Sequence, residues 1–210
     1  MTVDAREAAA AALRRLGHAV VGHDCDPALL ERIAAAAERI AADVEGGTPR
    51  SRPIESMKRR LWESPPPDGG PMSHFAECVV SGEANPMGIA IQPRRVGDEV
   101  VADFNLGAAF EGAPRRAHGG VVAAIFDDIM GYVLVLERTP AYTGQMTVDY
   151  LAPVPIGVDL QARAWMEARD GRKLRMRAEM TQDGAVIGRS TGLFIAIPPE
   201  RLGITASSTA

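Results

Sequence analysis

The segment that most constrains the fold runs from Gly119 to Leu136 and is apolar on nearly every side of the helix it predicts. A helix that is apolar all round is normally buried in the core of a domain. Two carboxylates, Asp127 and Asp128, lie inside it. A buried carboxylate is costly unless it is paired or used chemically. The chain therefore predicts a domain built around one central helix that carries a functional group.

The start of this helix predicts a site for negative charge. His118 is followed by Gly119 and Gly120, which place backbone N–H groups at the positive end of the helix. An anion or a developing oxyanion would bind there. An anion site and a costly carboxylate on one helix together favour acyl transfer or hydrolysis.

Composition excludes several classes of protein. The 210 residues, of which 46% are hydrophobic, suit one domain or one domain with an appendage. The formal net charge of −4 argues against nonspecific nucleic-acid binding, which needs a basic surface. Cys25 and Cys78 are the only cysteines, so they make no disulfide framework, and they lack metal-site spacing. We expect no metal and no other cofactor.

The expected location is the cytoplasm. The stretch Met1 to Leu16 has no continuous apolar core and no cleavage pattern, so we expect no signal peptide. Val121–Leu136 comes closest to the length of a membrane span, but it is short and contains two aspartates. We therefore expect no membrane partner.

The first third of the chain has a different residue pattern from the rest, which predicts helices and a linker. Helix formers with apolar spacing predict helices over Ala8–Leu16 and Leu29–Val44, and Asp26 followed by Pro27 is a helix-start signal. Residues 64–71 are rich in proline and glycine, which indicates a linker.

Strand patterns follow the linker on both sides of the central helix. Asp170-Gly171 and Asp183-Gly184 are tight-turn signals that make the last three strands an antiparallel meander. The fold class is therefore α+β, with an antiparallel sheet wrapped around a long central helix. The candidate strands are Phe75–Val80, Met87–Arg94, Glu99–Leu106, Tyr142–Leu151, Val158–Ala168, Lys173–Gln182 and Ala185–Ile197.

Three motifs occur together: His118-Gly119-Gly120, Asp127 on the helix they open, and a strand from Thr143 that ends in Tyr-x-x-Pro-x-Pro. With these motifs the chain resembles the PaaI-like acyl-CoA thioesterases of the hotdog fold. Weaker matches are Asn85–Gly88, Gly171–Lys173 and Asp183–Gly188.

The resemblance divides the chain into three parts. It covers about residues 75–197, which would form the hotdog thioesterase domain. Residues 1–74 would then be a helical N-terminal extension with the Pro-rich linker, and residues 198–210 a flexible tail. Two helices that pack on the outer sheet are the simplest expectation for the extension, and an arm that binds a partner or extends a dimer is the alternative.

The resemblance also implies catalytic roles. Asp127 is expected to attack the thioester carbonyl or to activate a water, and the sequence leaves both open. The Gly119 N–H would polarise the thioester oxygen. His118 would border the site, with a helix-capping role as the alternative. Thr143 would hydrogen-bond the attacking water or the carboxylate. Some members carry an asparagine where this chain has Gly112, so the surroundings of the site differ from that branch.

Acyl-CoA is the expected substrate. Its phosphates would be met by basic residues at the entrance, for which Arg116, Arg172 and Lys173 are the candidates. We group Gly120 and Asp128 with these substrate-binding residues. Asp128 lies about 100° round the helix from its neighbour, so its expected role is structural or electrostatic.

Helix geometry adds a prediction about assembly. Gly119 and Asp127 are eight residues apart, which is roughly 12 Å along a helix. An oxyanion donor and an attacking group must each lie about 3 Å from one reacting centre. Two antiparallel helices related by a twofold axis satisfy this condition better than one helix. We expect a homodimer with two composite sites, or a tetramer made of two such dimers.

Two other functions remain as alternatives. A hydratase of the same fold needs an aspartate and a histidine together, but all four histidines precede Asp127. A non-catalytic acyl-CoA-binding or regulatory module would not require a carboxylate in an apolar helix. The acyl group, and the choice between coenzyme A and acyl carrier protein, stay open.

Overall fold

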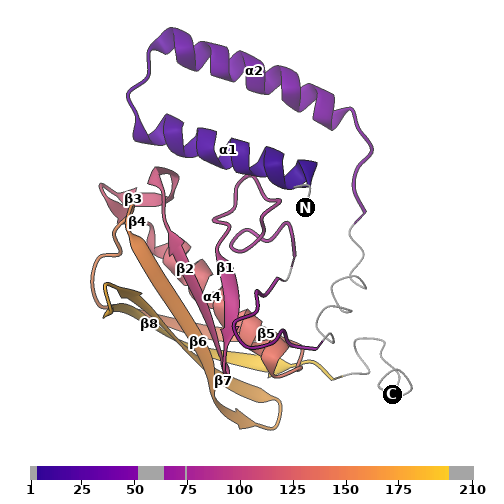
Figure 1. Cartoon of the computed structure of the whole chain (residues 1–210), viewed down its shortest axis with the longest axis vertical. Helices are drawn as coiled ribbons and strands as arrows, with labels where there is room; N and C mark the ends of the chain where they lie inside the picture. Colours follow the sequence, from indigo (N-terminus) through magenta and orange to yellow (C-terminus); the bar gives the residue numbers. More distant parts are fainter. Residues whose placement is uncertain (1–3, 52–63, 74, 199–210) are drawn as a thin grey trace.

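The computed structural model describes residues 4–51, 64–73 and 75–198 (Figure 1). Apart from Pro198, the tail predicted for residues 198–210 lies outside these ranges, as do residues 1–3, 52–63 and 74 of the predicted N-terminal part.

Two antiparallel helices precede the sheet. α1 spans Ala5–Gly22 and α2 spans Pro27–Glu45. Asp26 caps α2, because its carboxylate accepts a hydrogen bond from the Ala28 N–H at 2.7 Å and Pro27 follows as the first helical residue. α1 lies between α2 and the rest of the molecule (Figure 1). Both predicted helices are confirmed, and α1 extends further at each end than its apolar spacing indicated.

One six-stranded antiparallel sheet forms the body of the molecule, in the order β1-β2-β6-β7-β8-β5. A short 3-10 helix, η1 (Ala108–Phe110), and a two-stranded ribbon, β3 (Glu111–Ala113) with β4 (Arg116–Ala117), connect the sheet to α4 (Gly119–Leu136). The strands of the sheet are β1 (Gln92–Val96), β2 (Glu99–Asn105), β5 (Ala141–Tyr150), β6 (Asp159–Asp170), β7 (Lys173–Gln182) and β8 (Ala185–Ala196).

The turn between β7 and β8 fixes the register of the meander. Asp183 and Gly184 both have positive φ, 48° and 79°, which is the backbone of a two-residue hairpin turn. The predicted meander of the last three strands is therefore confirmed.

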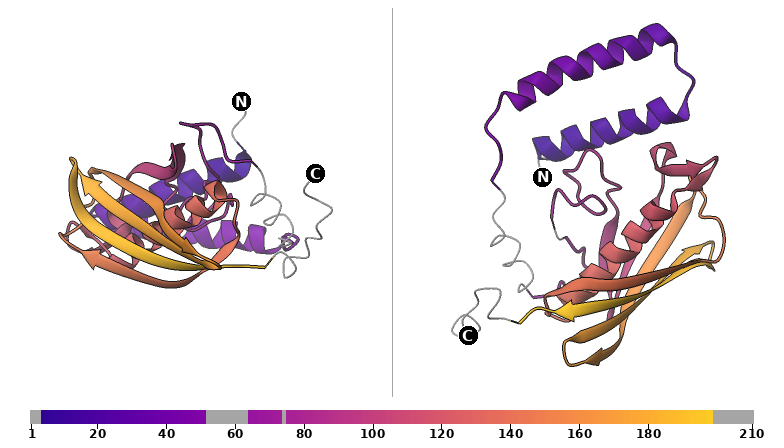
Figure 2. Two further views of the ribbon diagram at one scale, coloured as in Figure 1. Left: turned by 90° about the horizontal axis from the view of Figure 1, so that it is seen from below. Right: turned by 180° about the vertical axis from the view of Figure 1, so that it is seen from behind.

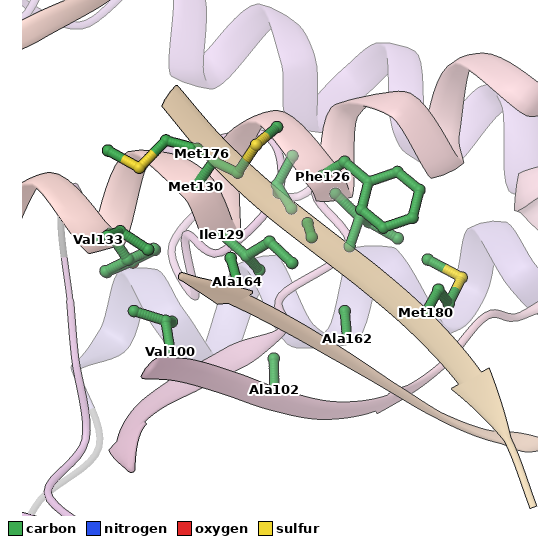
Figure 3. Close-up of a cluster of buried hydrophobic side chains, with 14 of the residues drawn as sticks. Val100, Ala102, Phe126, Ile129, Met130, Val133, Ala162, Ala164, Met176 and Met180 are labelled. Carbon is green, nitrogen blue, oxygen red and sulfur yellow. The ribbon is translucent and has the colours of Figure 1, made fainter. Parts of the chain in front are cut away.

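The sheet curves around α4, and its inner face forms the core (Figure 2). Phe126, Ile129, Met130 and Val133 of α4 are fully buried against this face (Figure 3). Small side chains oppose them, because alanines occupy the buried positions of the neighbouring strands. The narrow side chains allow the helix to lie close to the sheet. These alanines are Ala102, Ala162 and Ala164.

The apolar composition of α4 follows from this packing. By length and composition alone the helix could also cross a membrane. The sequence had indicated a segment slightly too short to do so. Its buried residues instead pack against the sheet, as expected for the central helix of an α+β domain.

The first strand prediction was wrong. Residues 75–80 form successive turns, in which the Cys78 N–H donates to the Phe75 carbonyl and the Gly82 N–H to the Cys78 carbonyl. A Cβ on Gly82 would lie 2.3 Å from the Cys78 nitrogen, so this tight backbone requires glycine. Of the next predicted strand, Met87–Arg94, only the last residues join β1.

Candidate active site

A histidine caps the start of α4. His118 has extended backbone angles (φ −65°, ψ 133°), and its Nδ1 accepts a hydrogen bond from the Gly120 N–H at 2.9 Å. A nitrogen that accepts a hydrogen bond carries no proton, so the ring is neutral in this arrangement. The capping role considered for His118 is present in the structure, and a part in catalysis stays a prediction.

Gly119 is the first residue of the helix. Its carbonyl accepts a hydrogen bond from the Tyr150 hydroxyl at 2.8 Å. Its N–H belongs to the first helical turn, where donors have no partner inside the helix, and no acceptor from the described residues meets it. A Cβ on Gly119 would lie 3.2 Å from the Tyr150 oxygen, so a side chain here would press on that tyrosine. The N–H is therefore available to a ligand.

Gly112 has a packing reason of its own. A Cβ at this position would lie 2.7 Å from the His118 Cα, closer than a side chain allows. An asparagine at this position would not fit this backbone. Glycine at position 112 therefore allows the β3–β4 ribbon to pack closely against the start of α4.

Asp127 and Thr143 meet on the exposed side of α4. The Thr143 hydroxyl Oγ1 donates a hydrogen bond to Asp127 Oδ1 at 2.8 Å. Both residues are exposed. The carboxylate is therefore oriented by a neighbouring strand while it remains accessible, and a base or a nucleophile needs both properties.

A β-bulge directs Thr143 toward the helix. Thr143 pairs with Phe194, whereas Gln145 pairs with the next residue, Leu193, so Gly144 is the extra residue in β5. Directly paired residues share a face of the sheet, and Phe194 is buried on the inner face. The bulge therefore moves Thr143 to the inner face, where it reaches Asp127.

Asp128 faces a different environment from Asp127. The Cys78 thiol donates to its Oδ1 at 3.2 Å, and its Oδ2 is buried without a partner among the described residues. Burial raises the pKa of Asp128, hydrogen bonds from Ser81 and Cys78 oppose the increase, and the charge of Asp127 adds to it. The structural or electrostatic role expected for Asp128 stays a prediction. No group of three or more His, Cys, Asp or Glu in the described part of the chain could hold a metal ion.

The predicted basic residues are divided between two places. Arg116 lines an open groove at the start of α4. Arg172 lies at the turn between β6 and β7, where its Nε donates to the Ala196 carbonyl at 3.0 Å, and Lys173 follows it at the start of β7. Neither of these two residues lines the groove. Their contact with substrate stays a prediction.

The groove has a volume of about 660 Å³. It includes the capped helix start but neither Asp127 nor Thr143. One chain therefore presents the N–H groups and the carboxylate in separate places, as expected from their spacing on an unbroken helix. The lining residues are Gly112, Ala113, Arg116, Ala117, His118, Gly119, Gly120, Val122, Tyr150, Leu151, Ala152, Pro153 and Val154.

A family model described as the thioesterase superfamily matches residues 116–187. This range begins just before the capped start of α4 and ends inside β8. Residues 116–187 belong to the thioesterase superfamily. The resemblance predicted from the three motifs is thereby confirmed at the level of the superfamily. The hotdog fold is confirmed as well.

The relatives of this thioesterase-superfamily domain include curated acyl-coenzyme A thioesterases. The chain is 30% identical to the protein THEM4 of Xenopus laevis over 102 residues, which is 48% of this chain and 46% of that protein. It is 27% identical to THEM4 of Mus musculus over 109 residues, 51% of this chain and 47% of that protein. The matched region is thus less than half the length of either relative.

A crystal structure of a thioesterase superfamily protein aligns with almost the whole chain. The TM-score is 0.78 with 26% sequence identity, and the alignment covers 92% of this chain and 92% of that one. Such coverage extends beyond the thioesterase-superfamily domain and includes most of the N-terminal part.

Two features of the site were missed from the sequence. Tyr150 was noted only as part of a motif, and its hydrogen bond to the Gly119 carbonyl joins positions 31 residues apart. The bulge at Gly144 had a signal, because a glycine inside a strand often marks one. The sequence did not indicate which side chain the bulge would redirect.

Proposed function

We propose that this chain is an acyl-CoA thioesterase, which hydrolyses an acyl-CoA thioester to the free acid and coenzyme A. The hydrogen bond from Thr143 to Asp127 is the observation that carries the proposal, because it orients an exposed carboxylate on the central helix of a thioesterase-superfamily domain. The acyl-CoA thioesterases among the relatives support the substrate class.

The chemistry assigns one task to the start of α4 and another to its middle. The Gly119 N–H hydrogen-bonds the thioester oxygen and stabilises the negative charge that develops on it. Asp127 either takes a proton from the attacking water or attacks the carbonyl carbon itself. In both routes the C–S bond breaks, the sulfur leaves as coenzyme A thiol after protonation, and water supplies the oxygen of the released acid.

The working unit in this proposal is a homodimer. β5 has one sheet neighbour, β8, within the described residues, so its other edge is open. Tyr142, Tyr150 and Leu151 at the two ends of this strand are 59%, 53% and 52% exposed. Antiparallel pairing of two β5 edges about a twofold axis would cover them and would run the two α4 helices in opposite directions. The Gly119 end of one helix then lies near Asp127 of its partner.

Thiol release from short, long and aromatic acyl-CoAs tests the activity. We expect wild-type turnover on at least one of them and a loss of about a thousand-fold or more in Asp127→Asn, because the amide neither attacks nor takes the proton. Asp149→Asn is the matched control, since Asp149 is an exposed carboxylate on the same strand as Thr143. Binding of acyl-CoA without any thiol release would favour a non-catalytic binding module.

Subunit mixing tests the composite site. Gly119→Pro removes the N–H, and proline suits the first helical position after the extended His118, while its Cβ requires a small shift of the Tyr150 hydroxyl. Asp127→Asn and Gly119→Pro should each be inactive. An equimolar mixture should regain up to about a quarter of the wild-type activity, because about half of its dimers are mixed and one of the two sites in each mixed dimer holds both intact groups. Mixtures that stay inactive although mixed dimers form, or a fully active monomer in light scattering, would refute the shared site.

A further inference from the structure

α1 docks on the domain through residues spaced four apart. Ala10, Arg14, His18 and Gly22 lie on one face of the helix, because positions i and i+4 are neighbours on its surface. Ala10 is 2% exposed, and a Cβ on Gly22 would lie 3.3 Å from the Ala108 side chain. This face contacts η1 and the turns that precede β1, so α1 is fixed to the domain along its length.

Arg14 fixes one end of the contact. Its Nη1 donates to the carbonyls of Glu83 and Asn85, at 2.8 Å and 2.6 Å. The partners are backbone atoms of a turn, so the guanidinium holds the path of the chain there. With α1 held there, the side chain of His18 lies against η1 in a defined position.

His18 holds η1 in three ways. Its Nδ1 accepts a hydrogen bond from the Ala109 N–H at 3.1 Å, and its ring packs edge-on against Phe110, with 5.0 Å between centroids. A Cβ on Gly107 would lie 2.5 Å from the same nitrogen, so the ring occupies the space that a side chain at position 107 would need. Burial, with a contribution from Arg14, lowers the pKa of His18 and favours the neutral ring that can accept this bond.

η1 in turn holds the start of α4. The His118 N–H donates to the Phe110 carbonyl at 2.8 Å, and the ribbon that lines the groove follows directly after η1. Two hydrogen bonds therefore connect the His18 ring to His118: one from the Ala109 N–H to His18, and one from the His118 N–H to the Phe110 carbonyl. The ring of His118 in turn caps α4 next to Gly119. A shift of η1 would move the backbone that presents the Gly119 N–H.

The geometry points to His18 as a positioning residue for the oxyanion end of the site, acting through η1 and His118. The N-terminal helix α1 then contributes to the site indirectly, through η1 and His118. This inference rests on the proposed thioesterase function for its kinetic consequence, but the structural link can be tested without activity.

Three variants separate the hydrogen bond from the packing. His18→Asn keeps an acceptor in the position of Nδ1 and loses the ring, whereas His18→Phe keeps a ring and loses the acceptor. His23→Asn is the matched control, because His23 directly follows α1 and, among the described residues, its ring bonds the Ala19 carbonyl rather than η1. Light scattering and thermal unfolding establish that each variant is folded and assembled.

Hydrogen exchange measures the structural link directly. In peptides covering residues 107–120 we expect about ten-fold faster exchange in His18→Phe and near wild-type exchange in His18→Asn and His23→Asn. Exchange in β6 and β7 should be the same in all of them. Unchanged exchange at residues 107–120 in His18→Phe, or equal acceleration in both His18 variants, would overturn the inference.

Kinetics on the best acyl-CoA of the panel gives the second readout. An effect on the oxyanion end should lower kcat about ten-fold in His18→Phe with KM changed less than about two-fold, and His18→Asn should restore most of kcat. A rise in KM alone would contradict a transition-state role. If the wild type hydrolyses no thioester, the proposed function fails, and the exchange result still decides whether His18 holds η1 and His118.

Discussion

The hydrogen bond between Thr143 and Asp127 gives a quantitative prediction. Thr143→Val has nearly the same shape and lacks the hydroxyl that donates to Asp127 Oδ1 at 2.8 Å. A hydrogen bond to a charged group contributes about 1.5–3 kcal/mol, but both residues are exposed in the single chain, so water compensates part of the loss. We take about 1.5 kcal/mol, which corresponds to a roughly ten-fold lower kcat/KM.

The assay is thiol release from the preferred acyl-CoA, with Thr143→Ser as the matched control that keeps the hydroxyl. We expect Thr143→Ser to remain within about three-fold of wild type. The free energy of unfolding should change by less than about 0.5 kcal/mol in both variants, because an exposed position near the end of β5 carries little packing. Full activity in Thr143→Val, or equal losses in both variants, would refute the role of this hydrogen bond.

Two predictions concern stability. Phe126→Ala removes a ring that is 0% exposed and should lower the free energy of unfolding by about 3–5 kcal/mol in urea titrations, whereas a loss below about 1 kcal/mol would mean that the core collapses around the gap. The raised pKa of Asp128 means that the fold favours its protonated form, so its contribution to stability is present below the unfolded pKa and is lost as the pH rises through the folded pKa. The stability of wild type relative to Asp128→Asn should therefore fall as the pH rises above the usual pKa of an aspartate, about 4, and parallel curves in urea titrations would contradict it.

The central helix and the last strands could be predicted from local pattern alone. The apolar run after His118 is long enough to specify a buried helix, and Asp183-Gly184 selects a hairpin turn with positive φ at both residues. The residues of the three main motifs were placed on the right elements for the same reason, since each motif lies on one helix or one strand or directly beside its end.

The wrong strand shows where local pattern fails. Residues 75–80 contain Cys78, Val79 and Val80, which favour a strand, but the backbone turns there and closes on Gly82. A turn that depends on one glycine and on contacts with α4 competes with β propensity, and the sequence alone does not decide between them.

Contacts between segments far apart in the chain could not be predicted from local pattern. His18 meets Ala109 across 91 positions, and Cys78 meets Asp128 across 50. Nothing in the neighbourhood of either partner indicates the other, because the pairing depends on how whole elements pack. Asp127 and Asp128 of α4 therefore look alike in the sequence, although Asp127 is exposed beside Thr143 and Asp128 is partly buried beside Cys78.

The order of the sheet has a consequence for how the chain is made. α4 and β5 are synthesised before β6, β7 and β8, although β5 pairs only with β8 within the described chain. On the ribosome, the most apolar helix of the described chain is therefore synthesised before three of the strands that cover it. Its folding cannot finish during synthesis of the N-terminal half, and a nascent chain stopped between β5 and β8 would expose α4 to chaperones or to other chains.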